Sequence, residues 1–431
     1  MLHENYSVNA AGHLCLNGAD TTVLAEKYGT PLYLLDEDYI RARCRLYKRA
    51  MEKYFGNGSS VLYASKANSF KKIYRIIDEE GLGTDVVSSG ELYTALEAGF
   101  PAERIFFHGN AKTDEDIRFG VESGVGCFVA DNYDELRRLD KCAGERGVKQ
   151  KFILRVTPGI DTHTFEAVNT GKVDSKFGAA IETGQAMELT EKALAFKNLE
   201  LLGFHCHVGS QVFDPKPFLD TAEIMIGYLA AVRDSLGFTA QLLDIGGGFG
   251  VRYVESDPQL DVDATIHSIA EYMKVKCSAL GFPLPKVLME PGRGIVAAAG
   301  VTVYTVESVK TITGFKSYAA IDGGMTDNPR YALYRSQYTV YPAGNMNANP
   351  DFVCDVVGRC CESGDIICPN ARIPMPKSGD LLAVAVTGAY NFSMASNYNS
   401  IPRPPIVMVS GDGDHLAVRR ESFADMTARQ L

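Results

Sequence analysis

Lys66 is the residue whose type and position best indicate chemistry, because it directly follows a short β-rich run at residues 61–65. A lysine at the carboxyl end of a strand can face an enclosed cavity, where desolvation lowers the pKa of its amine and makes it a nucleophile. Lysine is rarely buried, so the structural alternative is a solvated surface residue. The other groups that reach the same place decide between these two interpretations.

The elements that would position Lys66 are short β-rich runs separated by helical patterns. Eight such runs occur, at residues 61–65, 84–88, 105–108, 126–130, 152–156, 201–207, 241–245 and 286–289. Strand–helix alternation repeated eight times is typical of a (β/α)8 TIM-type barrel, and an open doubly wound sheet is the alternative. Barrel enzymes place their reactive groups at the carboxyl ends of the strands.

Polar and glycine motifs follow most of these runs. The candidates for a shared site are Lys66, Asp85, His207, Ser210, Gly247, Gly248, Glu290, Pro291, Gly292 and Arg293, while His108, Arg155, His205 and Asp244 occupy similar positions without an assigned role. Each motif has a structural alternative: the glycines could form only a tight turn, His207 could be a core histidine, and Glu290 could pair with Arg293. If all of these motifs lie at one end of one barrel, it is implausible that every one of them has only a structural role.

A glycine turn for phosphate, a nucleophilic lysine, a flat imidazole and a carboxylate together suit one cofactor, pyridoxal 5′-phosphate. Lys66 would bond to the cofactor aldehyde, Glu290 would keep the pyridine nitrogen protonated, and His207 would stack on the ring. The residues that would hold the phosphate are Gly248, Ser210 and Arg293. The dinucleotide interpretation is weak, because the glycines do not match G-x-G-x-x-G followed by a ribose-binding acid. Such a site supports carbanion chemistry at Cα.

After about residue 295 the pattern changes to alternating runs with few helices, at residues 301–309, 338–341, 351–357 and 381–386. The first 35 residues also contain strand-like runs, at 13–16 and 31–35. We therefore predict an α/β barrel plus an all-β domain, with the barrel at residues 36–295. The β-sandwich or barrel domain would be discontinuous, formed by residues 1–35 and 296–431.

Composition restricts the class of protein. The net charge of −10 argues against nucleic acid or an anionic membrane as the main partner, and no apolar stretch reaches membrane-spanning length. The first residues lack the basic and apolar regions of a signal peptide. Ten cysteines occur without a C-x-x-C pair, which favours reduced thiols over disulfides or a zinc site. We expect a cytoplasmic protein without a bound metal.

The chain resembles the diaminopimelate decarboxylases, a family of alanine racemase-like, fold-type III pyridoxal-phosphate enzymes. The motifs that carry the resemblance are residues 63–68, 85–92, 174–178, 205–211, 246–250, 290–293, 361–365 and 388–390. The resemblance covers about residues 30 to 410. It implies decarboxylation of meso-2,6-diaminopimelate to L-lysine, the last step of lysine biosynthesis, by a head-to-tail homodimer with shared active sites.

The resemblance also implies roles for residues of the second domain. Cys361 would donate the proton to Cα after carbon dioxide leaves, and Tyr390 would contact the cofactor phosphate and the substrate. The distal amino-acid group of the substrate would be bound by Arg293, Arg330, Tyr334 and Glu362. The family's cofactor-binding set extends to Asp85, Gly247, Pro291 and Gly292.

Other functions remain open at this stage. A diamine substrate such as ornithine would leave the arginines unpaired, at a cost of about 2–5 kcal/mol. Related ornithine decarboxylases typically carry aspartate where Glu362 stands. Departures from the family pattern at Ala111, Arg359 and Ile401 leave room for another basic or carboxylated diamino acid, of the D-ornithine, D-lysine, ornithine or carboxynorspermidine type. A non-catalytic regulator should have lost Lys66 or Cys361, and a racemase would need a second base.

Overall fold

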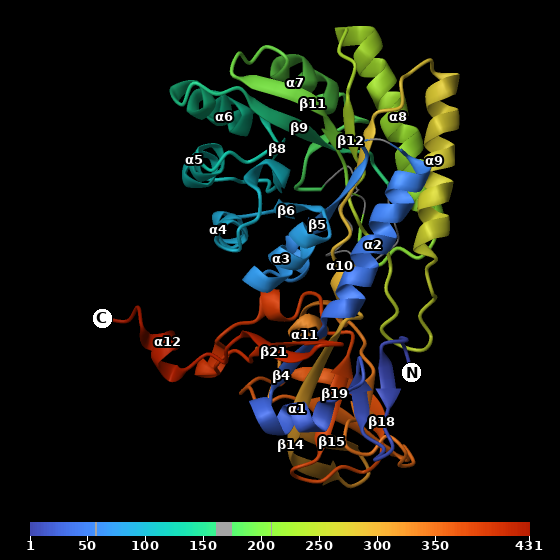
Figure 1. Cartoon of the computed structure of the whole chain (residues 1–431), viewed down its shortest axis with the longest axis vertical. Coiled ribbons are helices and arrows are strands. Elements are labelled where there is room, and N and C mark those ends of the chain that lie inside the picture. The colour runs from blue at the N-terminus through green and yellow to red at the C-terminus, as the bar shows by residue number, and fades with distance from the viewer. Residues whose placement is uncertain (57, 161–174, 208) are drawn as a thin grey trace. The chain divides into compact units, whose positions relative to one another are not determined.

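The computed structural model describes residues 1–56, 58–160, 175–207 and 209–431 (Figure 1). Asp174 and Val208, which belong to two of the motifs above, lie outside the described residues. The chain forms two compact units. The barrel unit consists of Arg43–Gly250 and Gln259–Gly294, and the sheet unit consists of Met1–Ala42, Val251–Pro258 and Ile295–Leu431.

The barrel unit is a closed ring of eight parallel strands. They are β5 (Ser60–Ala64), β6 (Gly83–Val86), β7 (Ile105–Phe107), β8 (Cys127–Ala130), β9 (Gln150–Thr157), β11 (Leu199–His205), β12 (Leu242–Asp244) and β13 (Lys286–Met289), with the short β10 (Ala179–Ala180) beside β9. The ring closes where β13 pairs with β5, with Leu288 opposite Ser60 and Met289 opposite Val61. The predicted TIM-type barrel is confirmed, and this closing pair excludes the open sheet.

Helices follow the strands of the ring. Those of this unit are α3 (Lys71–Glu79), α4 (Ser89–Glu97), α5 (Asp114–Glu122), α6 (Tyr133–Glu145), α7 (Gln185–Ala193), α8 (Lys216–Leu236) and α9 (Val262–Ala279), while α2 (Glu37–Tyr54) and α10 (Arg293–Val296) cross between the two units. Polar caps begin several of them: Ser88 accepts the N–H of Glu91, and Asn132 accepts that of Glu135. Each cap directly follows a strand, so the chain turns at the strand's carboxyl end.

A buried ion pair fixes the loop after β7. The Lys112 ammonium lies 2.8 Å from the Glu135 carboxylate in α6, and both side chains are 1% exposed. The ammonium also donates to the carbonyl oxygens of Gly109 at 2.9 Å and Val129 at 2.7 Å. All three donors of the ammonium are therefore used. The pair anchors the loop that begins at His108.

Lys112→Met should lower the free energy of unfolding by about 3–5 kcal/mol, because removing one partner leaves the Glu135 carboxylate buried and without its cation. Chemical denaturation followed by circular dichroism measures the loss. The matched control is Lys141→Met, which removes an exposed lysine that lies 3.8 Å from Glu145 and should cost less than about 1 kcal/mol. Equal losses for the two variants would contradict the anchoring role.

The sheet unit is built mainly of strands. Its larger sheet contains β4 (Leu32–Asp36), β14 (Gly300–Ile312), β15 (Lys316–Ile321), β16 (Val340–Pro342), β17 (Phe352–Val357), β18 (Ile366–Ile373), β19 (Leu381–Ala385), β20 (Ile406–Ser410) and β21 (Gly413–Val418). The N-terminal β4 pairs with β14 on one side and with β20 on the other. Residues from both ends of the sequence therefore share one sheet, and the predicted all-β component is confirmed.

The remaining elements of the sheet unit are short. They are β1 (Tyr6–Val8), β2 (Leu14–Leu16) and β3 (Ala19–Asp20), which form a small antiparallel sheet, and the helices α1 (Thr21–Tyr28), α11 (Arg330–Tyr334) and α12 (Phe423–Thr427). Within the described ranges, no helix combines the length and apolar character needed to cross a membrane.

One carboxyl group in the core of the sheet unit is poised to titrate near neutral pH. Asp327 is buried, accepts the hydroxyl of Tyr304, and accepts the N–H of Gly324 at 2.9 Å. Burial raises the pKa of Asp327 to about 7, although these hydrogen bonds oppose the rise. In the unfolded chain an aspartate has a pKa of about 3.9.

The folded protein should therefore lose stability as the pH rises from about 4 to 7, because the unfolded state releases the Asp327 proton first. Asp327→Asn removes this pH-dependent contribution. The free energy of unfolding of the variant relative to wild type should therefore increase by about 2.6 kcal/mol between pH 5 and pH 8. Urea denaturation at both pH values tests this. Asp351→Asn, at an exposed position, controls for the loss of a carboxylate. A pH-independent difference for Asp327→Asn would contradict the assignment.

Candidate active site

Lys66 lies in a single 3-10 turn, η1 (Ser65–Ala67), directly after β5, and its side chain is exposed. The neighbouring strand β6 carries the buried Asp85, whose carboxylate accepts the N–H of Ser65 at 2.9 Å. Burial and the Glu290 carboxylate raise the pKa of Asp85 well above its usual value, while the Lys66 ammonium opposes that rise. Lys66 and Asp85 are thus electrostatic neighbours at adjacent strand ends.

The turn that carries Lys66 is held from two further sides. The Glu91 carboxylate in α4 accepts the Ser65 hydroxyl at 3.0 Å and the N–H of Val87 at 2.7 Å. Gly292 packs against the end of β5, where an added Cβ would lie 2.8 Å from the carbonyl oxygen of Ala64. The chain after β13 therefore approaches the Lys66 turn more closely than any larger residue would allow.

The glycine turn after β12 lies beside His207. Gly246 and Gly248 have φ values of 71° and 105°, a region that favours glycine. A Cβ on Gly247 would lie 2.1 Å from the carbonyl oxygen of Glu290, and one on Gly248 would lie 2.4 Å from that of Gly209. The N–H of Gly247 donates to Nδ1 of His207 at 3.3 Å. Glycine at these positions therefore lets the turn pack directly against the backbone at Glu290 and Gly209.

Two polar residues of the predicted phosphate site contact each other in the barrel unit. The guanidinium of Arg293, at the start of α10, donates to the hydroxyl of Ser210 at 3.0 Å. Arg293 is buried, and Ser210 is half-buried. The loops after β11 and β13 therefore place a hydroxyl and a cation side by side, as an anion site requires.

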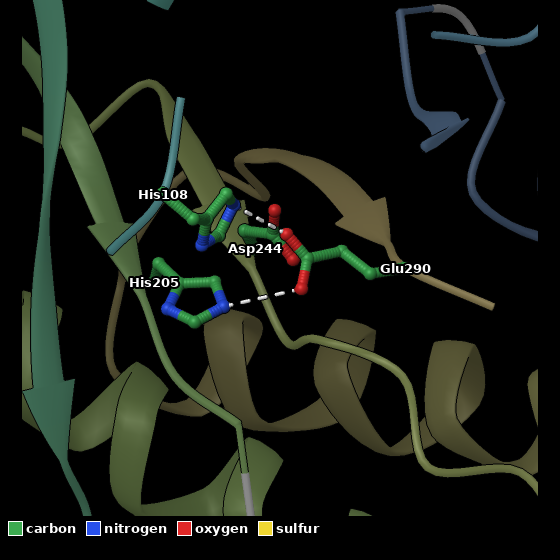
Figure 2. Close-up of side chains that lie close together, drawn as sticks. All are labelled: His108, His205, Asp244 and Glu290. Carbon is green, nitrogen blue, oxygen red and sulfur yellow. Dashed lines mark hydrogen bonds and ion pairs between the residues drawn. The ribbon is translucent and has the colours of Figure 1, made fainter. Parts of the chain in front are cut away.

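Glu290 follows β13 and is the centre of a buried polar cluster with His108, His205 and Asp244 (Figure 2). Nε2 of His108 lies 2.8 Å from Oε1 of Glu290, and Nε2 of His205 lies 3.3 Å from Oε2. Although burial acts in the opposite direction, His108 and His205 hold the pKa of Glu290 well below its usual value. Burial, followed by the Glu290 charge, raises the pKa of Asp244 well above its usual value. Glu290 is therefore the anion of the cluster.

Burial also acts on both imidazoles of the cluster. It lowers the pKa of His108, and it lowers that of His205 to about 3. The four ligand atoms of the cluster lie within 4.8 Å of one another, so the set could hold a metal ion by residue type. The contacts of 2.8 and 3.3 Å, however, have the length expected where an imidazole N–H meets a carboxylate oxygen directly.

The sheet unit gathers the residues predicted to bind the substrate. Arg330 begins α11 and is buried, with its guanidinium 5.6 Å from the ring of Tyr253, 5.8 Å from that of Tyr334 and 5.4 Å from that of Tyr390. One of its amino groups donates to the hydroxyl of Ser336 at 3.1 Å. Although desolvation acts to lower it, the surrounding tyrosines leave the pKa of Arg330 raised. This arrangement is a buried cation lined by aromatic faces.

Cys361 and Glu362 lie on an exposed turn of the sheet unit between β17 and β18. The N–H of Cys361 donates to the side-chain oxygen of Asn399 at 2.8 Å, and the N–H of Asp365 donates to the carbonyl oxygen of Glu362 at 3.1 Å. The neighbouring Cys360 is buried. The turn thus presents the Cys361 thiol and the Glu362 carboxylate outward from a backbone that is hydrogen-bonded on both sides.

The structure brings the predicted residues together as two groups, one in each unit. The barrel group consists of Lys66, Asp85, His207, Ser210, Gly247, Gly248, Glu290, Pro291, Gly292 and Arg293; the sheet group consists of Arg330, Tyr334 and Tyr390, with Cys361 and Glu362 on the exposed turn. Sequence reasoning assigned no role to His108, His205 and Asp244. In the sequence, these residues were marked only by their position at the ends of three strands. The register of a closed barrel decides which strand-end residues contact one another, and the sequence does not show that register.

Comparison with known proteins identifies the family. A family model described as "Pyridoxal-dependent decarboxylase, pyridoxal binding domain" matches residues 37–297. A diaminopimelate decarboxylase of Bacillus subtilis (strain 168) is 45% identical over 430 residues, which span 100% of this chain and 98% of the relative. A solved diaminopimelate decarboxylase from M. jannaschii, in co-complex with L-lysine, is 32% identical with a TM-score of 0.92, covering 100% of this chain and 99% of that one. The enzyme from Helicobacter pylori complexed with L-lysine is 30% identical with a TM-score of 0.85, covering 95% and 98%. These matches confirm the resemblance carried by the motifs, and the chain belongs to the diaminopimelate decarboxylase family of pyridoxal-dependent decarboxylases.

Proposed function

We propose that this chain uses pyridoxal 5′-phosphate to decarboxylate meso-2,6-diaminopimelate to L-lysine and carbon dioxide, as the last step of lysine biosynthesis. One observation carries the proposal: Lys66, the glycine turn and the Glu290 anion lie at strand ends of one barrel, in a chain whose relatives over its full length are diaminopimelate decarboxylases. The fold, the cofactor class and the reaction class of these relatives therefore all agree with the proposed activity.

The barrel group fits the cofactor. Lys66 supplies an exposed amine at a strand end, and the turn at Gly247 and Gly248 packs where any side chain would clash with the neighbouring backbone. Ser210 and Arg293 supply a hydroxyl and a cation for the phosphate. When bound, pyridoxal phosphate supplies an electron sink for the electron pair that remains at Cα after carbon dioxide leaves.

Each barrel residue then has a defined task. Lys66 holds the cofactor covalently through its amine, next to the Asp85 carboxylate. Glu290 presents a buried carboxylate to the ring nitrogen and keeps that nitrogen protonated. His207, with its Nδ1 bonded to the Gly247 N–H, offers one flat face for stacking. The roles proposed for Pro291 and Gly292 are structural, since they bring the chain after β13 against the Lys66 turn.

The sheet group supports an amino acid with a distal carboxylate as the substrate. Arg330 is buried, and its Nε has no hydrogen-bond partner among the described residues. A buried guanidinium with an unused donor favours a carboxylate ligand, which can accept two parallel N–H bonds. We assign Arg330, Tyr334, Arg293 and Tyr390 to substrate binding, and Tyr390 also to the cofactor phosphate.

Cys361 and Glu362 are proposed to act in the active site of a second copy of the chain. Both are exposed on a backbone turn that is already hydrogen-bonded, so they are available to a partner. Cys361 would return a proton to Cα, and Glu362 would bind the distal ammonium. A head-to-tail homodimer follows from this assignment. We also propose a cytoplasmic location, supported by the ten cysteines, which all lie in the described part of the chain and form no disulfide.

Product analysis of the cofactor-loaded protein tests the proposal. The purified protein is given meso-diaminopimelate, with ornithine, lysine and arginine in parallel reactions. We expect lysine and carbon dioxide from diaminopimelate, with little turnover of the other three substrates. Preferential turnover of a diamine amino acid such as ornithine would show that Arg330 has been assigned to the wrong ligand. Mixing a Cys361→Ala protein with a Lys66→Ala protein tests the shared site, because a head-to-tail dimer should regain activity in one of its two sites.

A further inference from the structure

The polar contacts of Glu290 go beyond what a single carboxylate opposite a cofactor requires. His108 follows β7, His205 ends β11 and Glu290 follows β13, so three strands of the ring contribute to one contact set (Figure 2). Nε2 of His205 is hydrogen-bonded to Oε2 at 3.3 Å, and Nε2 of His108 lies 2.8 Å from Oε1 as an ion-pair contact. Two partners on two oxygens fix both the position and the rotation of the carboxylate.

The geometry indicates which protonation states these groups have. Nδ1 of His205 has no hydrogen-bond partner among the residues that the structure describes. A doubly protonated ring would therefore bury an N–H without an acceptor, which costs free energy, whereas a neutral ring protonated at Nε2 does not. The positive charge of Arg155 also disfavours a second proton on either imidazole.

Asp244 completes the arrangement. Its Oδ1 accepts the N–H of Gly246 at 2.8 Å, at the start of the glycine turn. It is buried beside Glu290, and two adjacent buried carboxyl groups do not both ionise at low cost. With Asp244 neutral, Glu290 is the single negative charge of the cluster.

We propose that His108 and His205 are positioning residues that hold Glu290 as an oriented anion, and thereby hold the ring nitrogen of the bound cofactor in its protonated form. This inference rests on the proposed function. A neutral donor such as His205 stabilises the carboxylate without cancelling its charge, so the charge remains available to pair with a protonated ring nitrogen. A carboxylate oxygen has a second lone pair, which leaves room for that additional donor.

The test uses holoenzyme loaded with cofactor that carries ¹⁵N in its ring, because the nitrogen chemical shift reports whether the ring is protonated. His108→Met/His205→Met removes both imidazoles at similar volume, while His108→Gln/His205→Gln keeps a polar N–H group near each Nε2 position. We expect the Met variant to lose the protonated-ring signal and to bind the cofactor about 10- to 100-fold more weakly. The Gln variant should recover most of both. A protonated ring and unchanged cofactor affinity in the Met variant would overturn the proposal.

A double-mutant cycle keeps the inference testable if the double Met variant folds poorly. In a Glu290→Gln background, His205→Met should have no further effect on the ring nitrogen, since the imidazole acts through the carboxylate. An additional effect there would show that His205 acts by another route. In the wild-type protein, ¹⁵N-labelled histidine should show a neutral ring at His205, and an imidazolium there would overturn the proposal.

A metal ion is the competing ligand for the same four residues. The cofactor-free protein is titrated with Zn²⁺ and then with pyridoxal phosphate. Zinc that binds at these histidines and must leave before the cofactor enters would overturn the proposal, and cofactor binding unaffected by zinc would support it. Failure of the proposed function is distinct from all these outcomes, because it appears as wild-type protein that binds the cofactor and releases no lysine from meso-diaminopimelate.

Discussion

Lys66→Ala should lower kcat/KM for decarboxylation of meso-diaminopimelate by about 10³-fold or more. The lysine amine is the covalent attachment point in the proposed mechanism, and loss of a group with a nucleophilic or proton-transfer role typically costs about 10²–10⁴-fold. The side chain is exposed in η1 while the turn itself is held by Asp85 and Glu91. Truncation of the Lys66 side chain should therefore abolish the reaction without lowering the stability of the barrel.

Two measurements separate loss of chemistry from loss of structure. Hydride reduction followed by peptide mass spectrometry should add the cofactor mass to the peptide with Lys66 in the wild-type protein and to no peptide of the variant. The control is Lys71→Ala, an exposed lysine at the start of α3 whose ammonium lies 3.1 Å from Glu97, and its kinetics should match wild type. A Lys66→Ala protein within tenfold of wild-type activity would place the reacting amine elsewhere.

The barrel could be predicted from sequence because its signals are local. Each β-rich run is followed by a cap or a glycine that turns the chain, as at Ser88 and Asn132, so strand number and order could be inferred without any tertiary contact. The predicted run at 286–289 matches β13 residue for residue. Where boundaries differ, as at the end of β11 after His205, the apolar pattern continues past the last paired residue.

The partners within the site could not be predicted in the same way. Which strand-end residues meet depends on the register of a closed ring, and the contact between His108 and Glu290 joins β7 to β13 across that ring. Tyr253 gives a second example. It belongs to Val251–Pro258, a short piece of the sheet unit that lies between two barrel segments in sequence, and its ring faces the Arg330 guanidinium. No periodic pattern marks so short a segment.

Arg330→Met should lower kcat/KM for meso-diaminopimelate by about 30- to several-thousand-fold, because the distal carboxylate would enter a buried site without its cation, at a cost of about 2–5 kcal/mol. Arg330→Lys should recover only part of the loss, since an ammonium keeps the charge without the two parallel donors of a guanidinium. The control is Arg372→Met, an exposed arginine on β18 of the same unit.

The deciding measurement is the preference between two substrates. Lysine, tested as both enantiomers, is diaminopimelate without the distal carboxylate, so it cannot use the Arg330 guanidinium. If Arg330 binds that carboxylate, Arg330→Met should lower kcat/KM for diaminopimelate and leave the slow turnover of lysine nearly unchanged. The ratio of the two kcat/KM values should then fall by the same factor as the value for diaminopimelate. If both substrates lose activity equally, Arg330 supports the packing of Tyr253, Tyr334 and Tyr390, and the carboxylate is bound by another group.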